Sequence, residues 1–460
     1  MPFTAISNEN DLKIVIVMVG LPARGKSYVS QKIMRYLKWM SVRCEIFNVG
    51  HYRRKLGFEK PDHEFFDFEN DELFKIREEA LKLAFNSMVE WFDQPVDDSN
   101  WERDLGRVAI LDATNSTRER RSTVLELCRE KGFVTMFVEN WCDISDVIEK
   151  NIEDTVKSSP DYTGMEVARA TEDFKNRIDN YERVYETLDQ NNDADLTFVK
   201  LINISEAVVI NKIRTYLQRR IVFYVINLQA KPKYIWLSRH GESLYNVEKK
   251  IGGDSSLSER GLQYARKLKS IVADTISGES KEHLTVWTST LIRTQETAQF
   301  LPYPKKKWKA LDELDAGLCD GMTYEEIEEQ YPEDFKARDD DKYEYRYRGG
   351  ESYRDVVIRL EPIIMEMERQ EHVLIITHQA VLRCIYAYFM NVPQEESPWM
   401  SIPLHTLIQL ETRPYGTIVT RIKANIPAVS TYKKKGTSSI GEIADPNSSS
   451  NIIFKTPERA

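Results

Sequence analysis

The chain has 460 residues, of which 41% are hydrophobic and 30% charged, and its formal net charge is −9. This length predicts two large domains, and the acidic balance disfavours a nucleic-acid-binding protein. No apolar run reaches the ~18 residues of a membrane span, and the N-terminus has no signal-peptide pattern. The five cysteines form no CxxC pair. We therefore expect a protein of the cytosol, a reducing compartment, without a membrane partner.

A phosphate-binding signature follows the first predicted strand. The apolar, β-branched run Ile14–Val19 leads into GLPARGKS, which fits G-x-x-x-x-G-K-S, and helical periodicity follows over Ser30–Trp39. This order of strand, glycine loop and helix is typical of a P-loop, in which backbone N–H groups hold the phosphates of a nucleotide such as ATP. The residues assigned to ATP binding are Gly20, Leu21, Pro22, Ala23, Arg24, Gly25, Lys26, Ser27 and Tyr28.

Asp112 follows the second predicted strand, Arg107–Leu111, at the position where P-loop proteins carry an acid for magnesium. We expect Lys26 to reach the β- and γ-phosphates, and Ser27 and Asp112 to bind Mg²⁺. The alternative for Asp112 is a helix N-cap, because the residues after it have a helical pattern.

Strands and helices alternate through the rest of the first half, which predicts a doubly wound α/β domain. Further strands are predicted at Phe133–Glu139 and Phe198–Ile202. The predicted helices are Glu72–Trp91, Asp143–Thr155, Glu166–Thr187 and Ala207–Arg220. An arginine cluster after Asp112 indicates either a solvated helix face or a phosphate clamp; it consists of Arg118, Arg120 and Arg121. Because no NKxD-type guanine reader follows a strand, the first half resembles a small-molecule kinase more than a GTPase.

The second half opens on YIWLSRHGES, residues Tyr234–Ser243, after a short polar linker that contains Pro232. The apolar run delivers Arg239 and His240 to the end of a predicted strand. A histidine ring nitrogen can accept a phosphoryl group, and the adjacent guanidinium fits phosphate oxygens. Taken alone, an RHG triplet is better explained as a surface loop.

A second histidine makes the surface-loop alternative weaker. His378 ends the predicted strand Val373–Thr377, and Arg293 follows the strand Leu284–Thr288. The carboxyl ends of parallel strands share one edge of a sheet, so these side chains should meet His240 there. Glu313 would then protonate the leaving alcohol. A zinc site is the rival, but no HxxxH spacing supports it.

These motifs resemble known families. RHGE, the S-x-x-x-R segment at Ser289–Arg293 and THQ at Thr377–Gln379 resemble the histidine phosphatase (phosphoglycerate mutase-like) superfamily. With GLPARGKS, DATNSTRERR, IGGD, DELDAG and GESY in this order, the chain resembles the 6-phosphofructo-2-kinase/fructose-2,6-bisphosphatase family over residues 10–425. The resemblance implies two α/β domains, a P-loop kinase over 1–230 and a histidine phosphatase over 231–428, before a tail at 429–460. It also implies synthesis of fructose 2,6-bisphosphate from ATP and fructose 6-phosphate, and its hydrolysis through phosphohistidine. Such an enzyme controls glycolysis and gluconeogenesis, and a homodimer is expected.

The resemblance implies roles for residues that match the family's motifs. His240 would be the nucleophile and Glu313 the acid, and the phosphoryl group would be stabilised by Arg239, Asn246, Arg293 and His378. The bisphosphorylated sugar would contact Arg239, Asn246, Gly252, Tyr324, Arg338, Lys342, Tyr353, Gln379 and Arg383. Fructose 6-phosphate would contact Arg54, Arg77, Thr114, Arg120, Lys157, Arg177 and Tyr181. The kinase active site would include Lys26, Asp112 and Cys142, although the residues alone indicate a structural thiol at Cys142.

One departure bears on the kinase. The family has V-K, two residues and then S-P-D-Y, whereas Val156-Lys157 is followed by a single residue before Ser159–Tyr162. Either the helix end shifts so that Lys157 reaches the sugar phosphate, or the kinase site is weakened. The alternatives to a bifunctional enzyme are a phosphatase or mutase with a nucleotide-sensing P-loop unit, and a non-catalytic regulator.

The Ser/Thr-rich tail from Ser430 predicts disorder. Its Lys433–Lys435 run, just before Thr437, is compatible with a target for a protein kinase, although a solvated tail without a function explains the pattern better.

Overall fold

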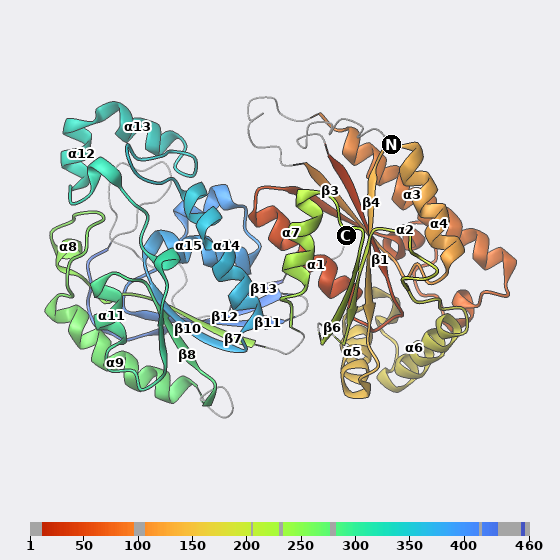
Figure 1. Ribbon diagram of the computed structural model, residues 1–460. Helices are drawn as coiled ribbons and strands as arrows, with labels where there is room; N and C mark the ends of the chain where they lie inside the picture. The colour runs from red at the N-terminus through yellow and green to blue at the C-terminus, as the bar shows by residue number, and fades with distance from the viewer. Residues whose placement is uncertain are drawn as a thin grey trace. The chain divides into compact units, whose positions relative to one another are not determined.

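The computed structural model describes residues 12–95, 106–203, 206–229, 233–276, 282–413, 416–430 and 452–455. The chain divides into two compact units between Gln229 and Ala230, one residue from the predicted boundary (Figure 1). Among the described residues, no helix has the length and apolar character that a membrane crossing requires.

The first unit is built on a six-stranded sheet in the order β2-β3-β1-β4-β5-β6. Its strands are β1 (Lys13–Val19), β2 (Arg43–Asn48), β3 (Arg107–Asp112), β4 (Val134–Trp141), β5 (Phe198–Ile202) and β6 (Ala207–Asn211). All neighbours are parallel except β5 and β6, which are antiparallel. Every residue from Ile14 to Val19 is fully buried, which is why this central strand reads as a continuous apolar run.

Helices cover both faces of this sheet. They are α1 (Lys26–Trp39), α2 (Val49–Lys55), α3 (Asp71–Asp93), α4 (Arg118–Glu130), α5 (Ser145–Ser158), α6 (Val167–Glu182) and α7 (Tyr216–Val225), with 3₁₀ turns η2 (His63–Phe66) and η4 (Pro160–Tyr162). Figure 1 shows α1 and α7 on one face and α3 and α4 on the other. The rings of Tyr36 and Tyr224 stack at 4.3 Å between α1 and α7.

The predicted helix at Ala207–Arg220 is wrong. Residues 207–211 form the edge strand β6, and α7 begins only at Tyr216, where Thr215 and Gln218 form a capping box. The β-branched run Val208–Ile210 suits a half-exposed strand better than a helix. The sequence also did not predict β2. Its residues, RCEIFN, do not alternate cleanly between polar and apolar positions, and several of them are partly exposed in the fold.

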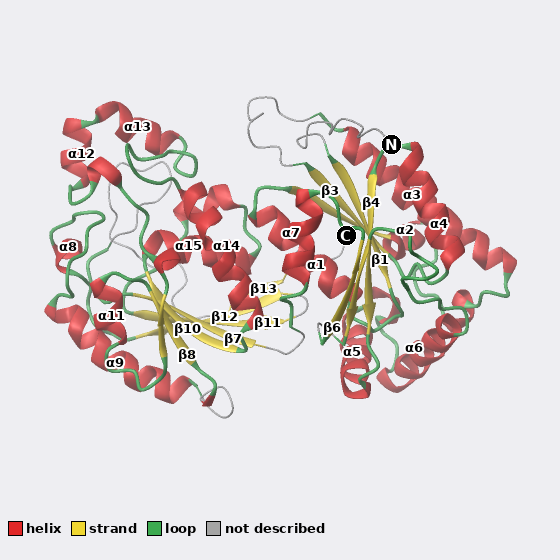
Figure 2. Cartoon of the chain, in the orientation of Figure 1, coloured by secondary structure: helices red, strands yellow, loops and turns green. Residues whose placement is uncertain are grey.

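The second unit contains a seven-stranded sheet in the order β13-β12-β11-β7-β10-β8-β9. Its strands are β7 (Lys233–Arg239), β8 (Thr285–Thr288), β9 (Lys305–Lys307), β10 (His372–Thr377), β11 (Thr406–Arg413), β12 (Gly416–Lys423) and β13 (Ile452–Lys455). β7, β10, β8 and β9 are parallel, whereas β11, β12 and β13 add an antiparallel side (Figure 2). Both units are thus α/β folds with mixed sheets, and the α/β class agrees with the sequence prediction; the first sheet is mostly parallel, whereas the second has three parallel and three antiparallel strand pairs.

The helices of the second unit are α8 (Leu244–Val247), α9 (Glu259–Thr275), α11 (Ile292–Ala298), α12 (Tyr324–Gln330), α13 (Pro332–Asp340), α14 (Tyr353–Arg369) and α15 (Gln379–Met390). The 3₁₀ turns are η5 (Lys309–Leu311), η6 (Gly317–Cys319) and η7 (Gln394–Trp399). α9 and α11 cover one face of the sheet, and α14 and α15 cover the other (Figure 1).

The predicted disordered tail needs a correction at four residues. Ile452–Lys455 forms β13, which pairs antiparallel with Gly416–Val419 of β12. The apolar run Ile452–Phe454 favours a strand more than the serine-rich sequence around it does. The Lys433–Lys435 run and Thr437 lie outside the described residues.

Candidate active sites in the two units

His240 lies where the sequence placed it, directly after β7. Its backbone N–H donates to Thr377 O of the neighbouring β10 at 2.9 Å, and the side chain is 3% exposed. Nδ1 lies 2.7 Å from Gly241 O, so Nδ1 carries the proton and Nε2 keeps its lone pair. Burial, followed by Arg293 and Arg239, holds the pKa of His240 well below the ordinary 6.5. The ring is therefore neutral at pH 7, which is the form that a nucleophile needs.

His378 follows β10 and is fully buried beside His240, with the two ring centroids 5.2 Å apart. Its Nε2 lies 2.8 Å from Ser289 Oγ. Burial, followed by Arg293 and His240, holds its pKa well below 6.5. The two histidines that the sequence assigned to one sheet edge are thus together, because the register pairs Arg239 with Thr377 and brings both strand ends level.

Positive charge and one carboxylate surround this pair. Arg239 is almost completely buried and donates to Ile402 O at 3.0 Å, and Arg293 donates to Gly253 O at 2.6 Å. Glu313 accepts hydrogen bonds from Gln379 N at 3.1 Å and Ala380 N at 3.2 Å, at the start of α15. Glu313 therefore stands beside the residue that follows His378.

The predicted sugar contacts fall into two hydrogen-bonded groups. Arg383 of α15 donates to the Tyr353 hydroxyl at 2.9 Å. Arg338 of α13 donates to the Tyr324 hydroxyl at 3.1 Å and to the Tyr347 hydroxyl at 2.8 Å. The sequence missed Tyr347, since nothing marks one tyrosine in the aromatic-rich segment KYEYRY.

The remaining predicted sugar contacts differ in how the structure uses them. The Lys342 ammonium lies 4.4 Å from the Trp399 ring centroid. Gly252 adopts φ 68°, and a Cβ there would lie 1.7 Å from Asp320 Oδ1, so another residue would be strained and would displace the carboxylate that accepts from Gly253 N. The Asn246 side chain accepts from Ser243 N at 3.0 Å as part of the α8 capping box. Asn246 is thus a local cap, with no hydrogen bond to either histidine.

Glu242 of the RHGE motif is fully buried and has a structural role that the sequence did not predict. Its carboxylate accepts from Ser258 Oγ at 2.7 Å, Arg260 Nε at 2.8 Å and Val429 N at 2.9 Å. Its backbone N–H donates to His405 Nε2 at 3.0 Å. These bonds fix the loop directly after His240.

The P-loop of the first unit has the geometry of an anion cradle. Ala23 and Gly25 adopt positive φ values of 58° and 81°, and Gly25 precedes the first residue of α1. A Cβ at Gly20 would lie 2.5 Å from Asn140 O, so this close backbone approach requires glycine. The Lys26 ammonium donates to Leu21 O at 2.6 Å within the loop. Burial lowers the pKa of Lys26 to about 8, against the opposing effect of Asp112.

The predicted magnesium ligands lie together. Ser27 Oγ donates to Asp112 Oδ2 at 2.8 Å, and Asn48 Nδ2 donates to the same oxygen at 2.8 Å. A hydroxyl and a carboxylate suit Mg²⁺, which keeps several waters and phosphate oxygens as further ligands. The alternative role of Asp112 as a helix cap is not realised, because α4 begins at Arg118 with Thr117 as its cap.

Three of the predicted fructose 6-phosphate residues, Arg54, Arg120 and Arg177, bind acidic side chains. Asp161 accepts from Arg54 at 3.2 Å, Arg177 at 3.4 Å and Arg53 at 2.5 Å. Arg120 pairs with Glu78. The other predicted residues contribute in different ways: Arg77 donates to Phe65 O and Asp67 O, Tyr181 packs with Phe66, and Thr114 O accepts from Gly20 N. Cys142 is a buried free thiol.

Lys157 stands apart from this group. Its side chain is 60% exposed and lies 3.4 Å from Glu153 one turn back on α5. The helix stays regular to its end, with Ser159 N donating to Thr155 O at 2.8 Å. Val156, three residues before Ser159, occupies the place where the family pattern has lysine. Val156 is buried in a cluster with Ala23 of the P-loop and Phe174, whose ring lies 5.7 Å from the Arg177 guanidinium. The helix end is therefore not shifted to bring Lys157 inward.

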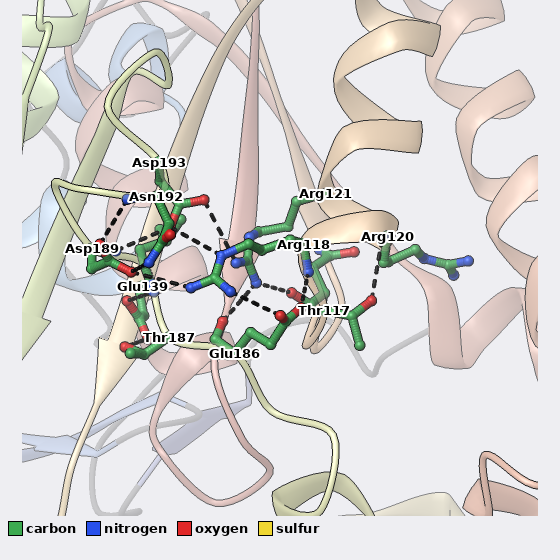
Figure 3. A network of polar contacts seen from close by, with 12 residues as sticks. Thr117, Arg118, Arg120, Arg121, Glu139, Glu186, Thr187, Asp189, Asn192 and Asp193 are labelled. Atoms are coloured by element: carbon green, nitrogen blue, oxygen red, sulfur yellow. Dashed lines mark hydrogen bonds and ion pairs between the residues drawn. The ribbon is translucent and has the colours of Figure 1, made fainter.

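The arginine cluster after Asp112 is mostly a structural clamp (Figure 3). Arg118 binds Glu186 at 2.8 Å and Asp189 at 3.1 Å. Arg121 donates to Glu186 O at 2.8 Å and lies 3.8 Å from Asp193. Both arginines thus hold the loop after α6 instead of a phosphate. The sequence could not distinguish this, because the acidic partners lie more than 60 residues further along the chain.

Comparison with known proteins gives two family matches and several relatives. The model for 6-phosphofructo-2-kinase matches residues 3–232, and that for branch 1 of the histidine phosphatase superfamily matches residues 235–425. The chain is 64% identical over 445 residues to "Fructose-2,6-bisphosphatase" of Saccharomyces cerevisiae, covering 96% of each chain. It is 46% identical over 421 residues to "6-phosphofructo-2-kinase/fructose-2,6-bisphosphatase" of Aquarana catesbeiana, covering 92% of this chain and 87% of the relative. The chain belongs to the 6-phosphofructo-2-kinase/fructose-2,6-bisphosphatase family.

Proposed function

We propose that the chain hydrolyses fructose 2,6-bisphosphate to fructose 6-phosphate and inorganic phosphate, and that its kinase unit makes the bisphosphate weakly or not at all. The observation that carries the hydrolytic part is the neutral His240, whose Nδ1–H is bound to Gly241 O and whose Nε2 is therefore nucleophilic. The yeast relative named as a bisphosphatase supports the same choice.

The proposed mechanism has two steps. His240 Nε2 attacks the 2-phosphate, the phosphorus–oxygen bond to the sugar breaks, and Glu313 gives a proton to the leaving oxygen. Glu313 then takes a proton from a water molecule, whose oxygen attacks the phosphorus; the phosphorus–nitrogen bond breaks, which returns His240 and releases inorganic phosphate. Arg239, Arg293 and His378 offset the negative charge of the phosphoryl group in both steps.

The exposed position of Lys157 supports the proposal of a weak kinase. A sugar phosphate in the first unit would contact the arginines that bind Asp161. It would lack a lysine contact, because Val156 stands where the family pattern has lysine and Lys157 is exposed. The second candidate is a fully bifunctional enzyme, and the complete P-loop favours it. We propose that ATP still binds there, with Ser27 and Asp112 holding Mg²⁺, which would neutralise phosphate charge when bound.

The test follows phosphate in wild type and His240→Ala. Labelled [2-³²P]fructose 2,6-bisphosphate should release phosphate with wild type only, and acid-labile label should appear on the wild-type chain. In the second arm, [γ-³²P]ATP and fructose 6-phosphate are supplied to His240→Ala, which cannot remove the product. Rapid accumulation of labelled bisphosphate would favour the bifunctional enzyme, and no phosphate release by wild type would refute the proposed hydrolysis.

We make two finer proposals: family membership supports a homodimer, and the basic run before Thr437 supports phosphorylation of the tail by a protein kinase. Sedimentation of the full chain tests the first, and mass spectrometry of the chain isolated from cells tests the second.

A further inference from the structure

A pair of buried hydroxyl groups supports His378. Ser289 Oγ lies 2.8 Å from His378 Nε2 and 2.8 Å from Thr294 Oγ1, and it accepts from Leu291 N at 3.1 Å. Thr294 Oγ1 also lies 2.9 Å from Leu291 O. Ser289, Thr294 and His378 are all fully buried, so water does not compete for these bonds. Each hydroxyl has one proton; Ser289 Oγ has two acceptors within reach, and Thr294 Oγ1 has three, since Ser289 O lies 3.3 Å from it as well.

Two arrangements of these protons leave no hydroxyl unpaired. In the first, Thr294 donates to Ser289, and Ser289 donates to His378 Nε2, so the proton of a neutral imidazole is on Nδ1. In the second, Nε2–H of an imidazolium donates to Ser289, Ser289 donates to Thr294, and Thr294 donates to Leu291 O. Both arrangements use the same heavy-atom positions. The second also fits a neutral ring with its proton on Nε2, which has a lone pair at Nδ1, but a phosphate oxygen at Nδ1 would repel that lone pair and so select a state with an N–H at Nδ1.

His378 Nδ1 is buried and has no hydrogen-bond partner among the described residues. A buried polar atom of this kind is costly unless something binds it, and the His240 ring lies 5.2 Å away. We propose that Ser289 is a positioning residue that pairs with His378 Nε2 and so leaves an N–H at Nδ1 for the phosphoryl group, with Thr294 completing the hydrogen bonds of Ser289. This inference rests on the proposed hydrolysis and goes beyond it by naming what orients the second histidine.

The surroundings of His378 favour its neutral ring, and the neutral ring is the form whose tautomer Ser289 can influence. Five ionisable groups lie near His378. Arg239 ends β7 and His240 follows it, Arg293 lies on α11, and Arg359 lies on α14. Glu313 accepts from the backbone N–H of Gln379, the residue after His378. Four of them are basic, and together with burial they hold the pKa of His378 well below 6.5. A neutral imidazole has a free choice of tautomer unless a neighbour fixes it. Without Ser289, part of the population would have a lone pair at Nδ1, which repels a phosphate oxygen.

The experiment compares Ser289→Ala with Ser238→Ala across pH, using phosphate release from fructose 2,6-bisphosphate. Ser238 is an equally buried serine, whose hydroxyl lies 2.7 Å from the Tyr264 hydroxyl instead. We expect kcat of Ser289→Ala to fall about tenfold at neutral pH, the size of one lost hydrogen bond to a charged group, with KM nearly unchanged. The ratio of Ser289→Ala to wild-type kcat should rise as pH falls, because a protonated His378 carries Nδ1–H without help. Any loss of neutral His240 affects both proteins and cancels in this ratio.

A second pair of variants keeps the test independent of folding. Thr294→Val removes the hydroxyl with little change of shape, whereas Thr294→Ser retains it. In Thr294→Val, the Ser289 hydroxyl still has His378 Nε2 to donate to, so we expect both Thr294→Val and Thr294→Ser to keep kcat near wild type at neutral pH, unlike Ser289→Ala. With orthovanadate as the probe, ¹⁵N shifts of His378 should show a protonated Nδ1 in wild type and a tautomer mixture in Ser289→Ala. A pH-independent ratio, or the same His378 tautomer in both proteins, would overturn the inference. If wild type and Ser238→Ala release no phosphate, the proposed hydrolysis itself fails.

Discussion

Moving the lysine of α5 by one position should strengthen the kinase. In Val156→Lys/Lys157→Val the ammonium starts from a helix position that faces Ala23 and Phe174 instead of solvent. A lysine bond to a sugar phosphate contributes about 1.5–3 kcal/mol, as hydrogen bonds to charged groups do. Since each 1.4 kcal/mol is about tenfold, kcat/KM for fructose 6-phosphate should rise about 10- to 100-fold.

The same exchange has a cost in stability. Val156 is 6% exposed, and burying its side chain contributes about 1.5–3 kcal/mol. The stem of the new lysine recovers part of this. Loss of the exposed Lys157–Glu153 pair costs only about 0.3–0.5 kcal/mol. We therefore expect the variant to fold with a free energy of unfolding lowered by about 1–3 kcal/mol.

The assay measures labelled bisphosphate formed from [γ-³²P]ATP in a His240→Ala background, so that the product is not hydrolysed. Val156→Met is the matched control, because it fills the same apolar cluster without a charge, and Lys157→Val isolates the loss of the exposed pair. The reasoning is refuted if the exchanged variant folds and binds ATP but forms the bisphosphate no faster than Val156→Met.

Three further predictions concern both units. Burial holds the pKa of Lys26 at about 8, below the 10.5 of an exposed lysine, so the unfolded state binds more protons between these values and stability rises with pH there. Lys26→Met should therefore raise the free energy of unfolding at pH 7 by about 2–3 kcal/mol and flatten that slope, as urea titrations at several pH values would measure. Gly252→Ala should destabilise the second unit by about 1–3 kcal/mol and raise KM, because its Cβ meets Asp320; an unchanged urea midpoint would contradict this. Glu313→Gln should lower kcat for phosphate release about 100-fold with little change in KM. A large rise in KM would instead indicate that Glu313 binds the substrate.

Much of both folds can be predicted from local sequence. The apolar runs at Ile14–Val19 and Val373–Thr377 become central strands because such residues are stable only where helices cover both faces. Edge elements were harder. β2 and β6 are partly exposed, so their residues are selected for contact with water as well as for packing in the sheet, and their strand pattern is weak. The sequence therefore predicted a helix at β6.

The sequence by itself determined which chemistry the chain contains. GLPARGKS, RHGE and THQ place their functional groups at strand ends, and local backbone geometry suffices to present them there. Only the tertiary structure decided what those groups contact. In the folded chain, Arg118 and Arg121 bind an acidic loop, and Lys157 is exposed to solvent. Ser289 lies within hydrogen-bond distance of His378. The physical reason is that a side chain's partner depends on register and packing between distant segments, whereas its residue type and its place on a strand or helix are local.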